Sequence, residues 1–382
     1  MYKLSWLVQG LCLSVFLVAC GGGGGGGGQS DDANSDNTTN GEVNDDLSGT
    51  LFIGGEDEGW KLDLQTGRYS RIPGVDWERQ NQNTYPSSAD LSAYPMDYDG
   101  SKFLLKVENC RRTQNANYPS RYDDCVMTYS AQGQQQGSPG ILLQDMVGTP
   151  KLSRNGDYIA FFYDQYGSGS AAELALVITD LNFSIVSAAP VLVSGAYTAS
   201  SPSLTWLTDN RLAYTFDEDI YLSDAALNAS STAIATFSAA QGEPRDIAAS
   251  PDGQQLAFVL QTDSSSRTVT ATPWVINIDG TGLRQLARVS DGRRPSFENP
   301  TWSPDGNKIL FTHGRVTAAN PTDLGLQGGG YVIPADSNNI LLSQDPNVQQ
   351  IRSYFGMTSG RNNSELTTDF DIDEGPIAWL PN

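Results

Sequence analysis

The fold is decided by Trp302-Ser303-Pro304-Asp305-Gly306-Asn307-Lys308-Ile309-Leu310-Phe311, a stretch that recurs in altered form at four other places. The other copies begin at Ala249, Leu152, Trp206 and Met96. Proline presets φ for the first turn position, and Asp and Gly tolerate the conformations that follow, so Ser-Pro-Asp-Gly predicts a tight reversal. The short apolar run after it predicts a buried strand. The copies stand roughly 40 to 60 residues apart, a period typical of propellers and solenoids.

A second signature follows the better copies. Pro273 to Leu286 predicts a third strand, an Asp279-Gly280 turn and a fourth strand. One repeat is therefore a four-stranded antiparallel sheet, which is one propeller blade. The alternative is an ordinary β-sandwich with coincidental Pro-Asp-Gly turns.

Two sequence motifs resemble the TolB-like propeller repeat, a relative of the WD-type blade. They are Trp-Ser-Pro-Asp-Gly-x-x-Ile-x-Phe and Asp-Gly-x-Gly-Leu-x-x-Leu. The resemblance covers roughly residues 47 to 382 and implies an all-β, six-bladed propeller. It extends only to the family's propeller, since a tether stands here in place of the amino-terminal α/β domain. TolB propellers engage a peptidoglycan-associated lipoprotein, so the resemblance implies a protein partner.

The two ends of the chain are predicted to share one blade. Gly375-Pro376-Ile377-Ala378-Trp379-Leu380-Pro381-Asn382 matches the start of the repeat and then stops inside the turn. The missing continuation is found at Thr50–Ile53, Trp60–Leu64 and Tyr69–Ile72. We expect the carboxyl-terminal strand to join the amino-terminal blade and close the ring, which removes an exposed sheet edge.

The amino terminus predicts an anchored, exported protein. Residues 1–19 have a basic start and an apolar run too short to span a bilayer, as a signal peptide does. Leu17-Val18-Ala19-Cys20 resembles a bacterial lipobox, which implies lipidation of Cys20; a plain signal peptide with an incidental Cys is the alternative. Gly21 in place of Asp resembles lipoproteins sorted to the outer membrane, facing the periplasm or the cell surface. Residues 20–49 then form a Gly-, Asp- and Asn-rich tether, and residues 50–382 form the propeller.

Two cysteines remain for the propeller. Cys110 and Cys125 lie in one predicted insertion, and in an exported protein such a pair predicts a disulfide. A metal site is the weaker alternative because the single His313 is distant in sequence. The formal net charge of −21 argues against nucleic acid and against adhesion to anionic lipid by charge, so membrane contact is expected only through the anchor.

The long loops predict the binding face. In a propeller, the turns between strands one and two lie on one face, and the loops between strands two and three lie on the other. Here the first set is short and the second holds the insertions, and long loops on a rigid scaffold commonly bind partners. The candidate binding residues on this looped face are acidic, basic or aromatic: Glu56, Asp57, Glu58, Asp217, Glu218, Asp219, Arg293, Arg294, Trp77, Tyr118, Tyr166 and His313. The alternatives are solvated turns for the acids, and a surface cluster rather than an anion site for Arg284, Arg288, Arg293 and Arg294.

No catalytic residues or cofactors are predicted. The chain has no Gly-x-Ser-x-Gly elbow, and one His cannot build a His-rich metal site. Asp369, Asp371 and Asp373 alternate like calcium ligands, but Gly375 comes one place late and no Glu stands at the twelfth position. The sequence therefore predicts a non-enzymatic, monomeric, outer-membrane-anchored propeller that binds or scaffolds a cell-envelope protein or component. A surface lipoprotein that binds or processes carbohydrate is the alternative.

Overall fold

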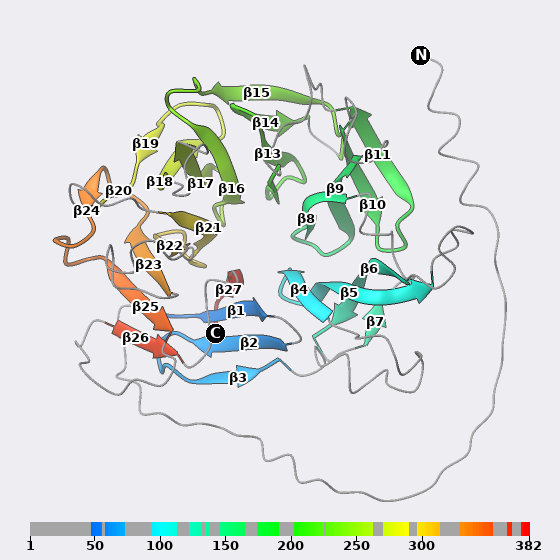
Figure 1. Cartoon of the computed structure of the whole chain (residues 1–382), viewed down its shortest axis with the longest axis horizontal. Coiled ribbons are helices and arrows are strands. Elements are labelled where there is room, and N and C mark those ends of the chain that lie inside the picture. The colour runs from blue at the N-terminus through cyan, green and yellow to red at the C-terminus, as the bar shows by residue number, and fades with distance from the viewer. Residues whose placement is uncertain are drawn as a thin grey trace, which may run out of the picture. The chain divides into compact units, whose positions relative to one another are not determined.

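The strands form a ring of blades. The computed structural model describes residues 47–55, 58–72, 93–112, 122–131, 134–136, 146–164, 174–190, 202–224, 227–262, 270–289, 296–313, 329–353, 365–368 and 376–382. Six sheets of four or five strands stand around a common centre in these residues (Figure 1). The all-β, six-bladed propeller that the TolB-like repeats predict is thus confirmed.

The first three blades have the predicted four strands. From the centre outward, blade one is β27 (Pro376–Leu380), β1 (Thr50–Gly55), β2 (Glu58–Asp63) and β3 (Tyr69–Arg71). Blade two is β4 (Ala93–Tyr98), β5 (Lys102–Arg112), β6 (Tyr122–Ser130) and β7 (Gln135–Gln136). Blade three is β8 (Met146–Leu152), β9 (Tyr158–Asp164), β10 (Leu174–Asp180) and β11 (Ile185–Pro190).

The last three blades complete the ring, and blade six departs from the four-stranded expectation. Blade four is β12 (Leu204–Trp206), β13 (Leu212–Phe216), β14 (Asp219–Ser223) and β15 (Ser231–Thr236). Blade five is β16 (Glu243–Ala249), β17 (Gln255–Thr262), β18 (Thr270–Asn277) and β19 (Arg284–Gln285). Blade six is β21 (Phe297–Trp302), β22 (Lys308–His313), β23 (Gly329–Pro334), β25 (Gln349–Ser353) and β26 (Glu365–Thr368), and β26 pairs parallel to β25. A parallel pair of β20 (Ala287–Arg288) and β24 (Ile340–Leu341) links blades five and six at their outer side.

The predicted closure of the ring is confirmed. β27 pairs antiparallel with β1, with Leu51 opposite Trp379. The hydroxyl of Thr50 also donates to Asn382 Oδ1 at 2.9 Å. The first and last described segments of the propeller therefore lie side by side in blade one (Figure 1).

The repeated turn holds its shape through one recurring hydrogen-bond set. In blade six the Ser303 hydroxyl donates to Asp305 Oδ1 at 2.6 Å and accepts the Lys308 amide at 2.9 Å. Ser250 makes the same contacts in blade five. The strands that follow are almost fully buried, and the core lies between blades: Val275 of blade five packs in one cluster with Trp302 and Phe311 of blade six.

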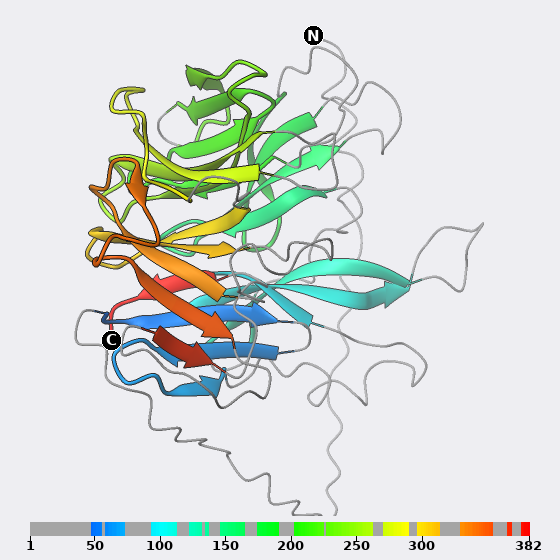
Figure 2. The same ribbon diagram turned by 60° about the vertical axis from the view of Figure 1, so that its left-hand side comes forward.

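Blade two carries a longer hairpin than the sequence predicts. Part of the insertion that the sequence predicts around Cys110 and Cys125 is strand, because β5 runs to Arg112 and β6 starts at Tyr122 (Figure 2). The pairing is interrupted between Val107 and Arg111 and then resumes, with Arg111 opposite Asp123 and Arg112 opposite Tyr122. No helix among the described residues is long and apolar enough to cross a bilayer.

Candidate functional site

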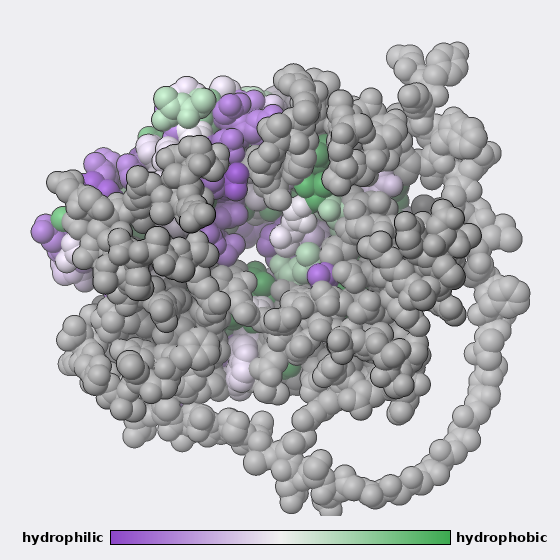
Figure 3. All heavy atoms as spheres, in the orientation of Figure 1, coloured by the Kyte–Doolittle hydropathy of each residue, from purple (hydrophilic) through white to green (hydrophobic). Residues whose placement is uncertain are grey.

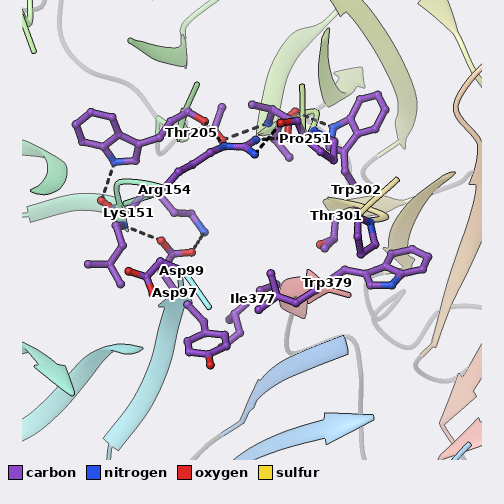
Figure 4. A pocket seen from close by; sticks show the side chains of 18 of the residues that line it. Asp97, Asp99, Lys151, Arg154, Thr205, Pro251, Thr301, Trp302, Ile377 and Trp379 are labelled. Carbon is purple, nitrogen blue, oxygen red and sulfur yellow. Dashed lines mark hydrogen bonds and ion pairs between the residues drawn. The ribbon is translucent and has the colours of Figure 1, made fainter. Parts of the chain in front are cut away.

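A cavity of about 420 Å³ lies at one end of the ring's centre, where the inner strands of all six blades converge. Thr205 and Thr301 lie close to the short turns that follow their inner strands, and β27 contributes Ile377 and Trp379 (Figure 4). We call this cavity the mouth. The space-filling view shows the ring hollowed at its centre, with hydrophilic and hydrophobic side chains both bordering the opening (Figure 3).

Inner strands are sheet edges, and at the mouth their backbone groups are satisfied by the neighbouring blade. Asp97 Oδ2 accepts the Leu152 amide at 2.7 Å, and Thr205 Oγ1 accepts the Ala249 amide at 3.2 Å. An unpaired backbone group in this position would cost free energy comparable to a lost hydrogen bond. The side chains therefore complete edges that strand pairing leaves open.

Tryptophan side chains make a second kind of contact between blades, in which the indole donates to a backbone carbonyl of the preceding blade. Trp206 Nε1 donates to Lys151 O at 3.0 Å, and Trp302 Nε1 donates to Ala248 O at 3.1 Å. Each indole thus fastens its inner strand to the preceding blade. Only 3% of Trp206, 6% of Trp302 and 5% of Trp379 is exposed, so these rings offer little open face to a ligand.

Asp97 and Lys151 form the ion pair of the mouth. Lys151 Nζ lies 3.3 Å from Asp97 Oδ1. Burial raises the pKa of Asp97, although the Lys151 charge and the Leu152 amide act in the opposite direction. Because this carboxylate already has a cation and a backbone donor, it is a structural link between blades two and three.

Arg154 spans three blades at the same end of the ring. Its guanidinium donates to the carbonyl oxygens of Ser250 at 2.7 Å, Pro251 at 3.1 Å and Ala249 at 3.3 Å (Figure 4). Its Nε also donates to Trp206 O at 3.5 Å. Burial lowers the pKa of Arg154, and the nearby Asp252 raises it. The side chain braces the turn of blade three against the turn of blade five.

Apolar residues make up much of the remaining wall. Proline contributes from two short turns, at Pro251 and Pro304, and from Pro381 after β27, and Ile247 and Ile377 add aliphatic surface. A concave apolar surface with a few fixed polar groups is the usual composition of a ligand pocket.

One predicted acidic turn is described by the structure. Asp217 and Glu218 are exposed between β13 and β14, and Asp217 has a φ of 48°. Burial raises the pKa of Asp217, and the charges of Glu218, Glu243 and Asp219 raise it further. Asp219 accepts the Tyr221 hydroxyl at 3.0 Å and the Thr236 hydroxyl at 2.5 Å, so this carboxylate is partly committed to blade four.

Most other predicted site residues lie outside the description. Cys20, Glu56, Asp57, Trp77, Tyr118, Tyr166, Arg293, Arg294, Asp369, Asp371 and Asp373 are not among the described residues. Glu58 and His313 are placed only by backbone, in β2 and β22. Arg284 donates to Ala335 O and Ser337 O of blade six, which agrees with a structural role better than with an anion site.

The cysteine pair is placed in facing strands. Cys125 is buried in β6 opposite Val107, and Cys110 lies in β5 at the register interruption between Val107 and Arg111; the Cys110 side chain is not described. The disulfide stays a prediction, and so does the metal alternative. Within the described ranges, no three His, Cys, Asp or Glu side chains group together in a way that could hold a metal ion.

Sequence reasoning missed the mouth. It placed binding among the long loops, whereas the described cavity lies among the short turns. A signal was present: Arg154 occupies the position of the turn proline that is Pro251 in blade five and Pro304 in blade six. A long cation in place of a proline indicates a side chain with a partner elsewhere in the ring.

Comparison with known proteins returns structural likeness alone. No family model and no curated protein matches the chain. Similar solved structures include a putative TolB from Agrobacterium tumefaciens, with 15% identity, a TM-score of 0.46, and coverage of 78% of this chain and 88% of that one. TolB from Acinetobacter baumannii has 13% identity, a TM-score of 0.46, and coverage of 78% and 66%. The GH74 enzyme of Niastella koreensis has 14% identity, a TM-score of 0.47, and coverage of 81% and 46%, so the chain spans about half of that enzyme. Likeness at this level carries no statement about function.

Proposed function

We propose that this protein is a non-enzymatic binding module that holds a segment of a cell-envelope protein at the mouth. The observation that carries the proposal is the convergence of six inner strands on one cavity of about 420 Å³ with apolar walls. Loops and turns that meet on a rigid scaffold are common sites of binding. A protein segment can present apolar side chains to such a wall and backbone groups to its polar points.

The charged groups of the mouth favour binding over catalysis. General acid–base or nucleophilic chemistry needs a group within reach of a substrate and free to exchange a proton. Asp97 is held by Lys151 and the Leu152 amide, and the Arg154 guanidinium is held by backbone carbonyls. These contacts commit Asp97, Lys151 and Arg154 to the scaffold.

The same geometry favours a protein partner over a carbohydrate. Sugar sites typically offer open aromatic faces, and the tryptophans of the mouth are almost fully buried between blades. The aromatic residues that prompted the carbohydrate alternative, Trp77, Tyr118 and Tyr166, lie outside the described residues.

The location of the module is proposed from the sequence. The Leu17–Cys20 lipobox and the Gly-rich tether support a lipid-anchored propeller at the outer membrane, facing the periplasm or the cell surface. The anchor would keep the propeller close to envelope partners and would provide its contact with the membrane.

Site-specific photo-crosslinking in intact cells tests the proposal. A photoreactive amino acid at Ile377, which lines the mouth, is compared with the same amino acid at the exposed Glu218 in the acidic turn. We expect a discrete crosslinked protein from position 377 and none from position 218. Capture from 218 alone would move the binding site to the looped face and refute the proposal.

A further inference from the structure

A second cavity, of about 160 Å³, lies deeper among the inner strands. It shares Lys151, Ile247 and Pro300 with the mouth, so the two cavities adjoin. Its own lining comes from residues on β8, β16 and β21 and from the start of β12 with the two residues before it: Gly148, Thr149, Pro202, Ser203, Leu204, Asp246 and Asn299. The cavity has room for more than one water molecule.

Asp246 is the carboxylate of this inner cavity, and its charge is poorly compensated. Its one hydrogen bond among the described residues comes from the Asn299 amide at 3.5 Å, the long limit for such a bond. The two cations whose charges act on Asp246 are shared with other carboxylates: Lys151 pairs with Asp97 and Arg245 pairs with Glu243, each at 3.3 Å. Burial raises the pKa of Asp246, and burial together with the charge of Asp246 raises the pKa of Glu298.

A carboxylate in a cavity is unfavourable when its neighbouring cations are shared with other carboxylates, and a further cation that enters the cavity would relieve that cost. Apart from Lys151, whose ammonium group pairs with Asp97, the other polar side chains of the lining carry oxygen atoms that can accept from N–H donors: the hydroxyls of Thr149 and Ser203 and the amide of Asn299. A single carboxylate suits an ammonium or guanidinium group better than a divalent metal, which takes six or more oxygen ligands.

We propose that the inner cavity receives the side chain of a lysine or arginine carried by the segment bound at the mouth, with Asp246 as its counterion. The inference rests on the proposed function, because the mouth is the route by which the side chain enters. It assigns the partner a chemistry: an apolar segment with a basic residue at the position that points into the ring.

Small cations that mimic the two side chains provide the test. The purified protein is titrated with n-propylguanidinium and n-butylammonium, and binding is followed by calorimetry and by the rise in melting temperature. We expect saturable binding that weakens at least fivefold in Asp246→Asn and is unchanged in Asp224→Asn, an exposed carboxylate of blade four. Tetraethylammonium, which has the charge but no N–H donor, should bind no better to the parent protein than to Asp246→Asn.

A second variant keeps the inference falsifiable if Asp246→Asn folds poorly. Thr149→Lys places a cationic side chain at the exposed edge of the same cavity, so its charge should weaken the response to both probes. An unaltered response in either variant, or no saturable binding to the parent protein, would overturn the inference. If neither probe binds but position 377 crosslinks to a protein, this inference is wrong and the proposed function stands. If the probes bind but position 377 crosslinks to no protein, the proposed function is wrong and the cation site stands.

Discussion

The closure of the ring can be tested by substitutions at its seam, which is the pairing of β27 with β1 and the residues around it. Trp379 of β27 is 5% exposed and packs with Leu51 of blade one and with Leu310 and Val332 of blade six. Its Nε1 donates to Ser48 O at 2.9 Å. Trp379→Ala therefore removes a buried aromatic side chain and a hydrogen bond at the place where the chain is joined without a covalent link.

The expected losses differ between two substitutions. Large-to-small replacement of a buried aromatic costs about 3–5 kcal/mol, so Trp379→Ala should lower the free energy of unfolding by that amount. Trp379→Phe keeps most of the apolar contact and loses the hydrogen bond, so about 1–2 kcal/mol is expected. Leu283→Ala, in an exposed turn of blade five, is the control and should change stability by less than about 0.5 kcal/mol.

Gly49 allows the seam to be perturbed without removing any contact. Its φ is 101°, and a Cβ there would lie 2.6 Å from Leu380 O and 2.8 Å from Trp379 Nε1. Gly49→Ala should therefore destabilise the fold by roughly 1–3 kcal/mol through backbone strain and displacement of β27.

Urea unfolding followed by far-ultraviolet circular dichroism measures all four variants. The slope of the free energy against urea separates loss of stability from partial opening, since it scales with the surface exposed on unfolding. If Trp379→Ala and Gly49→Ala both cost less than about 1 kcal/mol with an unchanged slope, the seam does not stabilise the ring and the reasoning fails.

Four further predictions follow from single groups. Arg154→Lys keeps the charge but loses the planar fork that reaches three carbonyls, so we expect a loss of about 1–2 kcal/mol in urea unfolding; a neutral effect would contradict the brace. Because the folded-state pKa of Asp246 is raised, the folded protein binds more protons than the unfolded chain above the ordinary value of 3.8, and stability should rise as pH falls from 7 toward 4. Asp246→Asn should reduce that slope, and an identical slope in the variant would exclude Asp246 as a source. Mass mapping of the unreduced, exported protein should find Cys110 joined to Cys125, and free thiols at both positions would reject the disulfide. Cys20→Ser should release the protein from the membrane fraction, where an unaltered distribution would reject the lipid anchor.

The sequence predicts the ring because its signals are local. Ser-Pro-Asp-Gly specifies a turn through the φ of proline and the hydrogen bonds of Ser303 and Asp305, and these contacts span only a few residues. The closure was predictable for the same reason, since Trp379 repeats the position of Trp302. The parallel addition of β26 and the pairing of β20 with β24 have no such signature, because pairing of strands as short as two residues is set by neighbours rather than by periodicity.

The mouth depends on contacts between distant parts of the chain. Lys151 and Asp97 are 54 residues apart, and Arg154 reaches a carbonyl 97 residues away. The sequence around Lys151 or Arg154 does not indicate these distant partners. The contacts form only when the blades are arranged around the centre of the ring. The departure of Arg154 from the repeat was visible, but its partners were not.

The side-by-side ends of the propeller make the protein suitable for circular permutation. Leu47 and Asn382 lie at the ends of one blade, and Thr50 contacts Asn382 directly. A short peptide between them would turn the present seam into a covalent hairpin, and new ends could be opened in an exposed loop of another blade. Such permutants would carry the same mouth with the point of attachment moved around the ring, so the angle at which the propeller is presented to a partner becomes adjustable by design.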